Sequence, residues 1–210
     1  MQLRVASGLT SEEYVSKRAW QQSSLSRCPL HPKGGCGFRS VGSYQRKQPA
    51  GLRIRRWYCP RSHRSFALVP DFAATRVAAS LAEIEAAVLE AEQGVDAGES
   101  LELVARRLRP DIEVAGAVRW LRRRRHWVAV VLAVVVGLAP ELLAGRELSL
   151  SALRVALGAE SVLERVRELV APQLASVPAP VGFAPLPRRR LRRSAAVQQS
   201  SGPDPPRPSP

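Results

Sequence analysis

The chain has 210 residues, a net charge of +14 and 17 prolines, and only 5% of its residues are aromatic. This length suffices for one ordinary domain or two small ones, and the many prolines indicate that part of the chain does not fold. The first residues lack the apolar segment of a secretion signal, and the number of cysteines is odd. Both features argue against an exported disulfide scaffold, so we expect a cytoplasmic protein.

The positive charge is concentrated in two parts of the chain. Residues 1–70 hold thirteen Lys and Arg against Glu12 and Glu13, and residues 176–210 hold six Arg against Asp204. Residues 71–175 are nearly neutral, with thirteen Arg and fifteen acids. Clustered basic side chains bind phosphates and release counterions, so the distribution predicts a nucleic-acid partner, with double-stranded DNA preferred.

Cysteine and histidine gather in one short stretch. All three cysteines and two of the three histidines lie within residues 28–63. Zinc takes four sulfur or nitrogen donors, and small modules use it in place of a large hydrophobic core. The sequence therefore predicts one structural Zn²⁺. The spacing favours Cys28, Cys36, Cys59 and His63 as its ligands, with His31 as the alternative to Cys36.

The basic region is predicted to contain one helix and a small antiparallel sheet. Thr10 and Glu13 have the spacing of a capping box, which begins a short helix at Ser11–Trp20. Three β-like segments follow, separated by turn residues and by the Cys59–His63 spacing. They are Phe38–Lys47, Leu52–Tyr58 and Ser65–Val69.

Helices are predicted after residue 71. Ser80 and Glu83 form a second capping box, and apolar side chains then recur at helical spacing. A helix at Ser100–Leu108, a break at Pro110 and a basic helix at Ile112–Arg125 together have the outline of a helix-turn-helix. Asp111 is the expected cap of the third helix. The competing interpretation is a plain helical hairpin with a solvated Arg face.

The last part of the chain divides into an apolar stretch, further helices and a tail. Trp127–Ala139 is shorter than the roughly 17–25 residues that a bilayer requires, so a buried helix is favoured over a membrane span. This apolar helix is also a candidate surface for homo-oligomerisation. One or two helices are expected over 147–170. From Pro172 the chain is rich in Pro, Ser and Arg, and its basic run at 188–193 is either a phosphate contact or a solvated tail.

Three segments carry a resemblance to a known family. They are CGFRSVGSYQRK, RIRRWYCPRSHRSFALVPDF and LELVARRL followed by VAGAVRWLRRRR. They resemble the zinc-ribbon and helix-turn-helix leader segments of bacterial insertion-sequence transposases. The resemblance implies that the ribbon and helices hold a transposon end, with Cys28, Cys36, Cys59 and His63 as metal ligands. The longer first loop and the final His depart from the pattern of that family.

We therefore expect an α+β protein: a small β zinc ribbon, a helix-turn-helix-like helical region and a disordered C-terminal tail. The expected divisions are 1–25 irregular, 26–70 ribbon, 71–126 helix-turn-helix region, 127–171 helical extension and 172–210 tail. No nucleotide loop or catalytic arrangement stands out, so neither an enzyme nor a small-molecule substrate is expected.

The expected function is non-catalytic, zinc-dependent DNA binding near the nucleoid, by an accessory factor or a degenerate transposase fragment. The expected DNA contacts are Arg39, Arg46, Lys47, Arg53, Arg55, Arg56, Arg119 and Arg122. The first alternative is an assembly protein whose zinc is purely structural and whose 127–139 helix mediates oligomerisation. A membrane-anchored regulator is a weaker alternative.

Overall fold

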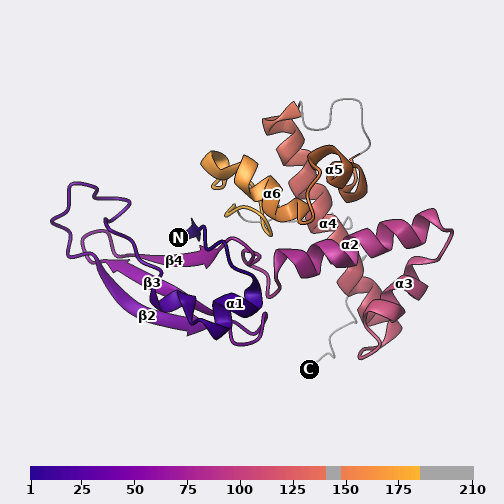
Figure 1. The fold of residues 1–210 in the computed structure, drawn as a ribbon, viewed down its shortest axis with the longest axis horizontal. Coiled ribbons are helices and arrows are strands. Elements are labelled where there is room, and N and C mark those ends of the chain that lie inside the picture. Colours follow the sequence, from indigo (N-terminus) through magenta and orange to yellow (C-terminus); the bar gives the residue numbers. More distant parts are fainter. Residues whose placement is uncertain (141–147, 185–210) are drawn as a thin grey trace, which may run out of the picture.

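The structure is a computed structural model, and it describes residues 1–140 and 148–184. It confirms the α+β class, with a four-stranded sheet at one end and helices at the other (Figure 1). The strands are β1 Gln2–Val5, β2 Arg39–Gln45, β3 Arg53–Cys59 and β4 Arg64–Pro70. The helices are α1 Ser11–Ser16, α2 Leu81–Asp96, α3 Leu101–Leu108, α4 Val114–Leu138, α5 Leu150–Leu157 and α6 Val162–Leu169, with short 3₁₀ turns η1 Ala19–Gln21 and η3 Ala171–Gln173.

The sheet has the order β1-β4-β3-β2. The three strands predicted from the sequence form an antiparallel meander, and Cys59 pairs with Arg64 across the tight β3–β4 turn. Strand β1 was not predicted, since residues 1–25 were expected to be irregular. It pairs in parallel with β4, with Leu3 opposite Leu68. Such pairing depends on residues more than sixty positions away, and so the local sequence does not reveal it.

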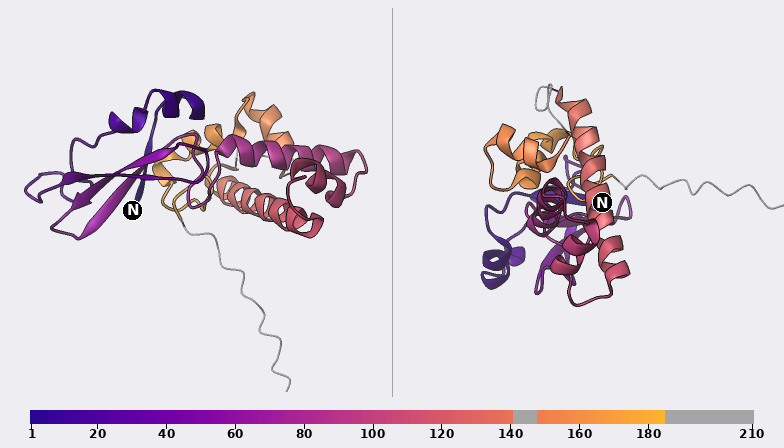
Figure 2. Two further views of the ribbon diagram at one scale, coloured as in Figure 1. Left: turned by 90° about the horizontal axis from the view of Figure 1, so that it is seen from below. Right: turned by 90° about the vertical axis from the view of Figure 1, so that its right-hand side faces the viewer.

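Helix α1 and turn η1 cover one face of the sheet (Figure 2). The predicted capping box is present: Glu13 N–H donates to Thr10 Oγ1 over 3.2 Å, and Thr10 N–H donates to Glu13 Oε2 over 3.0 Å. Tyr14 is buried against Phe72, with their rings 5.4 Å apart and nearly perpendicular. This contact fastens the N-terminal helix to the end of the sheet at which β4 leads into α2.

Helix α4 runs without a break through the boundary that was predicted at residue 126. The division between a recognition helix and an apolar helix is therefore wrong, because no Pro or Gly interrupts residues 117–136. Asp111 does not cap the helix. Its carboxylate instead accepts two hydrogen bonds from Arg109, at 2.7 and 2.6 Å, and Glu113 is the first flanking residue.

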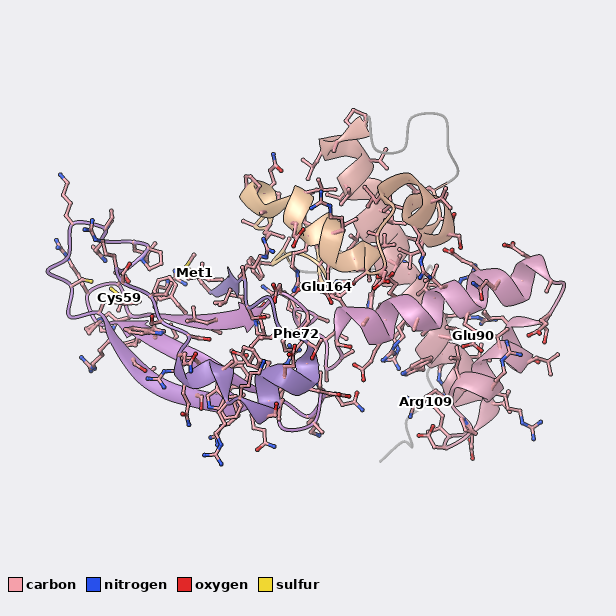
Figure 3. All side chains as sticks on the ribbon, viewed as in Figure 1. Met1, Cys59, Phe72, Glu90, Arg109 and Glu164 are labelled. Atoms are coloured by element: carbon pink, nitrogen blue, oxygen red, sulfur yellow. The ribbon has the colours of Figure 1, made fainter. Side chains whose placement is uncertain are left out.

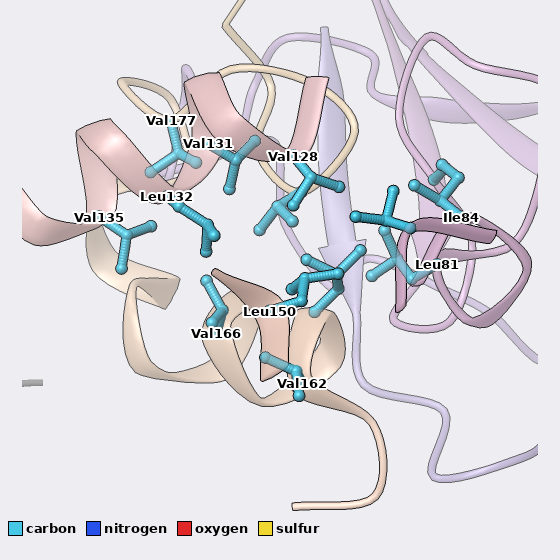
Figure 4. Close-up of a cluster of buried hydrophobic side chains, with 14 of the residues drawn as sticks. Leu81, Ile84, Val128, Val131, Leu132, Val135, Leu150, Val162, Val166 and Val177 are labelled. Atoms are coloured by element: carbon cyan, nitrogen blue, oxygen red, sulfur yellow. The ribbon is translucent and has the colours of Figure 1, made fainter. Parts of the chain in front are cut away.

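The largest core lies among the helices (Figure 4). Leu81 and Ile84 of α2 belong to the same cluster as Val128, Val131 and Leu132 of α4, and α5, α6 and the segment after η3 complete it. Most of the apolar face that was considered for oligomerisation is thus buried within the same chain. None of the helices in the described ranges has both the length and the apolar character that crossing a membrane requires.

Residues 174–184 contribute to this core, which corrects the expectation of disorder from residue 172. Leu174, Val177 and Val181 are at most 5% exposed, and Val177 appears beside α4 in Figure 4. Residues 185–210, including the basic run at 188–193, lie outside the described residues.

Two arginines and a threonine fasten the sheet to the helical part. Arg167 of α6 is 1% exposed, and its guanidinium donates to the carbonyl oxygens of residues 70, 71, 73, 180 and 181. Arg46 donates to the carbonyl oxygens of Ala74, over 2.7 Å, and Val77. Thr75 donates through its backbone N–H to Pro180, over 2.8 Å. Because these bonds cross between the two parts, the sheet and the helices form one packed unit.

Candidate metal centre

Three cysteines and one histidine converge at the end of the sheet that lies away from α2, where Figure 3 labels Cys59. The ligand atoms of Cys28, His31, Cys36 and Cys59 all lie within 4.8 Å of one another. His31 Nδ1 is 3.6 Å from Cys28 Sγ and 3.4 Å from Cys59 Sγ. A tetrahedral ion with bonds of about 2.3 Å to sulfur and about 2.1 Å to nitrogen holds such pairs about 3.6 Å apart, so the cluster fits one ion.

The loop between β1 and β2 brings three of these side chains together. His31 N–H donates to the Cys28 carbonyl oxygen over 3.1 Å, which closes a turn and aligns the thiol with the imidazole. Two residues in the left-handed region, Gly34 and Gly35, then reverse the chain toward Cys36. Glycine adopts this conformation without steric strain. The loop between Cys28 and Cys36 can therefore be longer than the usual two-residue spacing and still bring both thiols to the site.

Cys59, the last residue of β3, supplies the fourth ligand from the sheet. Burial raises the pKa of its thiol, but polar groups of Ser62 and the neighbouring thiols Cys28 and Cys36 outweigh burial and lower that pKa to about 6. Burial, followed by hydrogen bonds to the other two thiols, raises the pKa of Cys36. The cluster therefore already favours one thiolate, which is the form that binds metal.

His63 is not part of this group, and its choice as a ligand is wrong. Its ring Nδ1 lies 3.1 Å from the hydroxyl of Tyr58, and its side chain is exposed. Successive side chains of a strand point to opposite faces, so Tyr58 and Cys59 face opposite sides of the sheet. His63, held in the left-handed conformation at φ 50°, lies with Tyr58 and thus away from the thiols. His31 joins Cys36 in the cluster, whereas the sequence offers it only as an alternative to Cys36.

An aromatic cluster packs beneath the metal ligands. Phe38 and Trp57 stack with ring centroids 5.2 Å apart, and Phe66 meets Phe38 edge to face at 5.8 Å. The three cysteines are at most 5% exposed. A metal ion held by these four side chains would have four protein donors in a nearly closed environment.

The predicted DNA-contact residues of the sheet are divided between its two faces. The register places Arg39 opposite Tyr58, and β3 alternation places Arg56 on the same face as Tyr58 and Ile54. The guanidinium of Arg39 lies 6.0 Å from the Tyr58 ring centroid, and that of Arg56 lies 5.8 Å from the Tyr44 ring centroid. We call these four residues, Arg39, Tyr44, Arg56 and Tyr58, the Arg–Tyr surface.

The remaining predicted contacts have different surroundings. Arg53 and Lys47 are exposed, whereas Arg55 lies half-buried opposite Leu68 on the other face. The guanidinium of Arg46 donates hydrogen bonds to the carbonyl oxygens of Ala74 and Val77, which follow β4, and burial lowers its pKa. It is therefore an internal fastening and not a free phosphate contact.

On α4, Arg119 and Arg122 are exposed as expected, but Arg124, in the same run of arginines, is buried. Arg124 is 8% exposed, with its guanidinium 3.8 Å from the Trp120 ring centroid and 5.9 Å from that of Trp127. Burial, together with the charges of Arg109 and Arg123, lowers its pKa to about 10. The helical spacing of Trp120, Arg124 and Trp127 was a readable signal for this stack, which the sequence analysis missed.

The resemblance to transposase leaders rests on the quoted residues alone. No protein family, curated protein or solved structure gives a significant match to this chain.

Proposed function

We propose that this protein is a non-catalytic DNA-binding protein whose fold depends on one structural zinc ion. The observation that carries the proposal is the Arg–Tyr surface on the same hairpin that contributes Cys59 to the metal centre. Guanidinium groups bind phosphates, and the tyrosine rings beneath them hold their flat faces in place through cation–π contacts.

The charge around this surface supports a polyanionic partner. The first seventy residues contain only two acids, and both lie in the first turn of α1. Glu13 is already engaged by Thr10 and by Lys17, whose Nζ is 3.1 Å from its carboxylate. Arg39 and Arg56 are exposed, and within residues 1–70 the only acids that could neutralise them are these two on α1, so both guanidinium groups are available for phosphate.

Zinc is the ion that this donor set favours. Three thiolates and an imidazole in a tetrahedral arrangement match its structural sites, and magnesium and calcium prefer oxygen donors. In this role the ion joins the 28–36 loop to the end of β3 and so stiffens the end of the hairpin that carries Arg39.

Helix α4 supplies a second basic surface. Arg119, Arg122 and Arg123 are exposed, and their spacing places them along one side of the helix. Arg124 is buried against tryptophan and anchors this turn to the body of the protein. We propose that this side of α4 contacts the DNA backbone, in keeping with the expected helix-turn-helix and with the resemblance to transposase leaders.

The experiment is fluorescence anisotropy with a labelled 20-base-pair duplex at several salt concentrations. An Arg39→Ala/Arg56→Ala double variant is compared with an Arg106→Ala/Arg154→Ala variant, which removes the same charge from exposed positions on α3 and α5. Each phosphate contact that is lost lowers the salt slope by about 0.9, so the first variant should lose about two units and the control much less.

Equal salt slopes for the two variants would remove the Arg–Tyr surface from the proposal. Absence of duplex binding at low salt would overturn the function itself. A stable oligomer that is indifferent to DNA, measured by light scattering, would support the assembly protein instead.

A further inference from the structure

The sheet has an open edge at β1. Within residues 1–140 and 148–184 this strand pairs only with β4. Ala67 N–H donates to the Met1 carbonyl over 2.9 Å, and Asp71 N–H donates to the Val5 carbonyl over 3.1 Å. The backbone groups of alternate strand residues point to opposite sides, so those of Gln2 and Arg4 point away from β4. They form a short row of donors and acceptors that the sheet does not use.

A hollow of about 630 Å³ lies along this edge. It is lined by the consecutive residues Met1, Gln2, Leu3 and Arg4. Successive strand residues point to opposite faces, so a hollow that touches all four must follow the edge of the strand and not one face. In Figure 1, β1 lies on the side of the sheet toward α6 and the segment that follows it.

The opposite wall of the hollow is apolar. Leu25, Leu174 and Phe183 contribute to it, and the last two come from the segment after α6. The free strand edge and the apolar wall together match the requirements of an added strand. Main-chain hydrogen bonds hold such a strand, and alternate side chains enter pockets.

Polar groups at the hollow point to a ligand that is acidic. Arg4 Nε–H is a buried donor and Gln2 Oε1 is a buried acceptor, and neither has a hydrogen-bond partner among the described residues. A carboxylate oxygen satisfies the Arg4 donor, whereas a backbone N–H of an added strand satisfies the Gln2 acceptor. Buried polar atoms of this kind usually have a partner, and their orphaned state calls for an explanation. The hollow is also lined by Arg76, and none of the described residues that line it carries a carboxylate. The nearest ion pair is a long one, 3.7 Å from Arg4 to Glu168 at the surface.

We propose that the β1 edge is a docking site for an extended segment of a partner protein that carries apolar and acidic side chains. The segment adds to β1 as a fifth strand, its carboxylates face Arg4 and Arg76, and its apolar side chains lie against Leu174 and Phe183. Residues 185–210 of this chain are a poorer match, because they hold six Arg and only one acid. This inference is independent of the proposed DNA binding, which uses the Arg–Tyr surface of β2 and β3 together with α4.

The test uses the full chain and three labelled eight-residue peptides in fluorescence anisotropy. The first alternates valine and glutamate, the second alternates valine and lysine, and the third is the first with two central valines replaced by proline, which lacks the N–H donor. We expect the valine–glutamate peptide to bind at least tenfold more tightly than either of the others. Hydrogen exchange of the Arg4 amide should slow when that peptide binds.

Variants separate this site from general attraction to a basic protein. Arg4→Gln and Arg76→Gln should each weaken binding of the valine–glutamate peptide several-fold, whereas the control Arg154→Gln should leave it unchanged. Equal binding of the proline peptide, or equal effects of all three variants, would overturn the proposal. Binding that rises tenfold when residues 185–210 are deleted would identify the tail as the occupant and would also overturn it.

Discussion

The metal centre predicts opposite outcomes for two histidines. His31 Nδ1 lies 3.4 and 3.6 Å from two of the thiol sulfurs, whereas His63 lies on the other face of the sheet beside Tyr58. Apparent binding free energies of structural zinc are about 10–16 kcal/mol for four ligands, so one ligand carries on the order of 3 kcal/mol. Substituting His31→Ala should therefore weaken zinc binding about 10²- to 10³-fold.

The matched His63→Ala variant removes only an exposed hydrogen bond. Such a bond contributes about 0.5–1.5 kcal/mol at most, and none of it acts on the ion directly, so zinc affinity should change less than about threefold. The assay is competition for zinc against a chromophoric chelator, with elemental analysis of the purified proteins. Loss of zinc in His63→Ala together with its retention in His31→Ala would refute the assignment of the ligands.

Four further predictions concern pH and packing. Zinc affinity should rise between about pH 6 and pH 9, because the raised pKa of Cys36 leaves a proton on its thiol that the metal must displace. Cys59, with its pKa near 6, is already largely ionised at neutral pH. Calorimetry in buffers of different ionisation enthalpy counts the protons that zinc binding releases. In the metal-free protein, the lowered pKa of Cys59 stabilises the fold fully above the pKa of the unfolded thiol, and this contribution is lost as the pH falls toward about 6. Arg167→Met should lower the free energy of unfolding by about 3–5 kcal/mol in urea titration, because buried carbonyls lose their donor. Gly94→Ala should lower it by about 1–3 kcal/mol, since a Cβ would come within 2.5 Å of Val104 Cγ2 where α2 meets α3.

Each packing prediction has a matched control in the same chain. Arg165→Met removes a half-exposed arginine on the same helix as Arg167, whose guanidinium pairs with Glu168 over 2.9 Å. This change should alter the free energy of unfolding by less than about 1 kcal/mol. Gly137→Ala lies in α4 with no other heavy atom within 4 Å of the added Cβ, so it should stabilise the protein by up to about 1 kcal/mol. If either control destabilises as strongly as its partner, the packing argument for that site fails.

Elements governed by neighbouring residues were predictable. Both capping boxes are present, at Thr10 with Glu13 and at Ser80 with Glu83, because each depends on side chains three positions apart. The strands of the hairpin and helix α3 also occur where the sequence indicated. The metal cluster was recognisable as a group because all cysteines and histidines except His126 lie within residues 28–63.

The choice among the clustered ligands was not predictable from spacing. Cys-x3-His fits many metal sites, but here the four-residue turn between β3 and β4 places His63 beside Tyr58. Whether a side chain reaches the ion depends on which face of the sheet it occupies, and register decides the face. The role of Arg46 also could not be predicted from the sequence, in which it resembles the other basic residues of the segment. The chain after β4 packs against it, and its guanidinium donates to the Ala74 carbonyl oxygen.

By itself, the sequence determined the α+β class, the positions of most helices and strands, and the presence of a Cys-and-His site in a basic region. These features follow from periodicity, capping and composition, which act over a few residues. Tertiary structure alone decided the pairing of β1, the burial of Arg167, the packing of residues 174–184 into the core and the selection of His31. Each of these depends on groups that are far apart in the chain and become neighbours only when the sheet and the helices pack together.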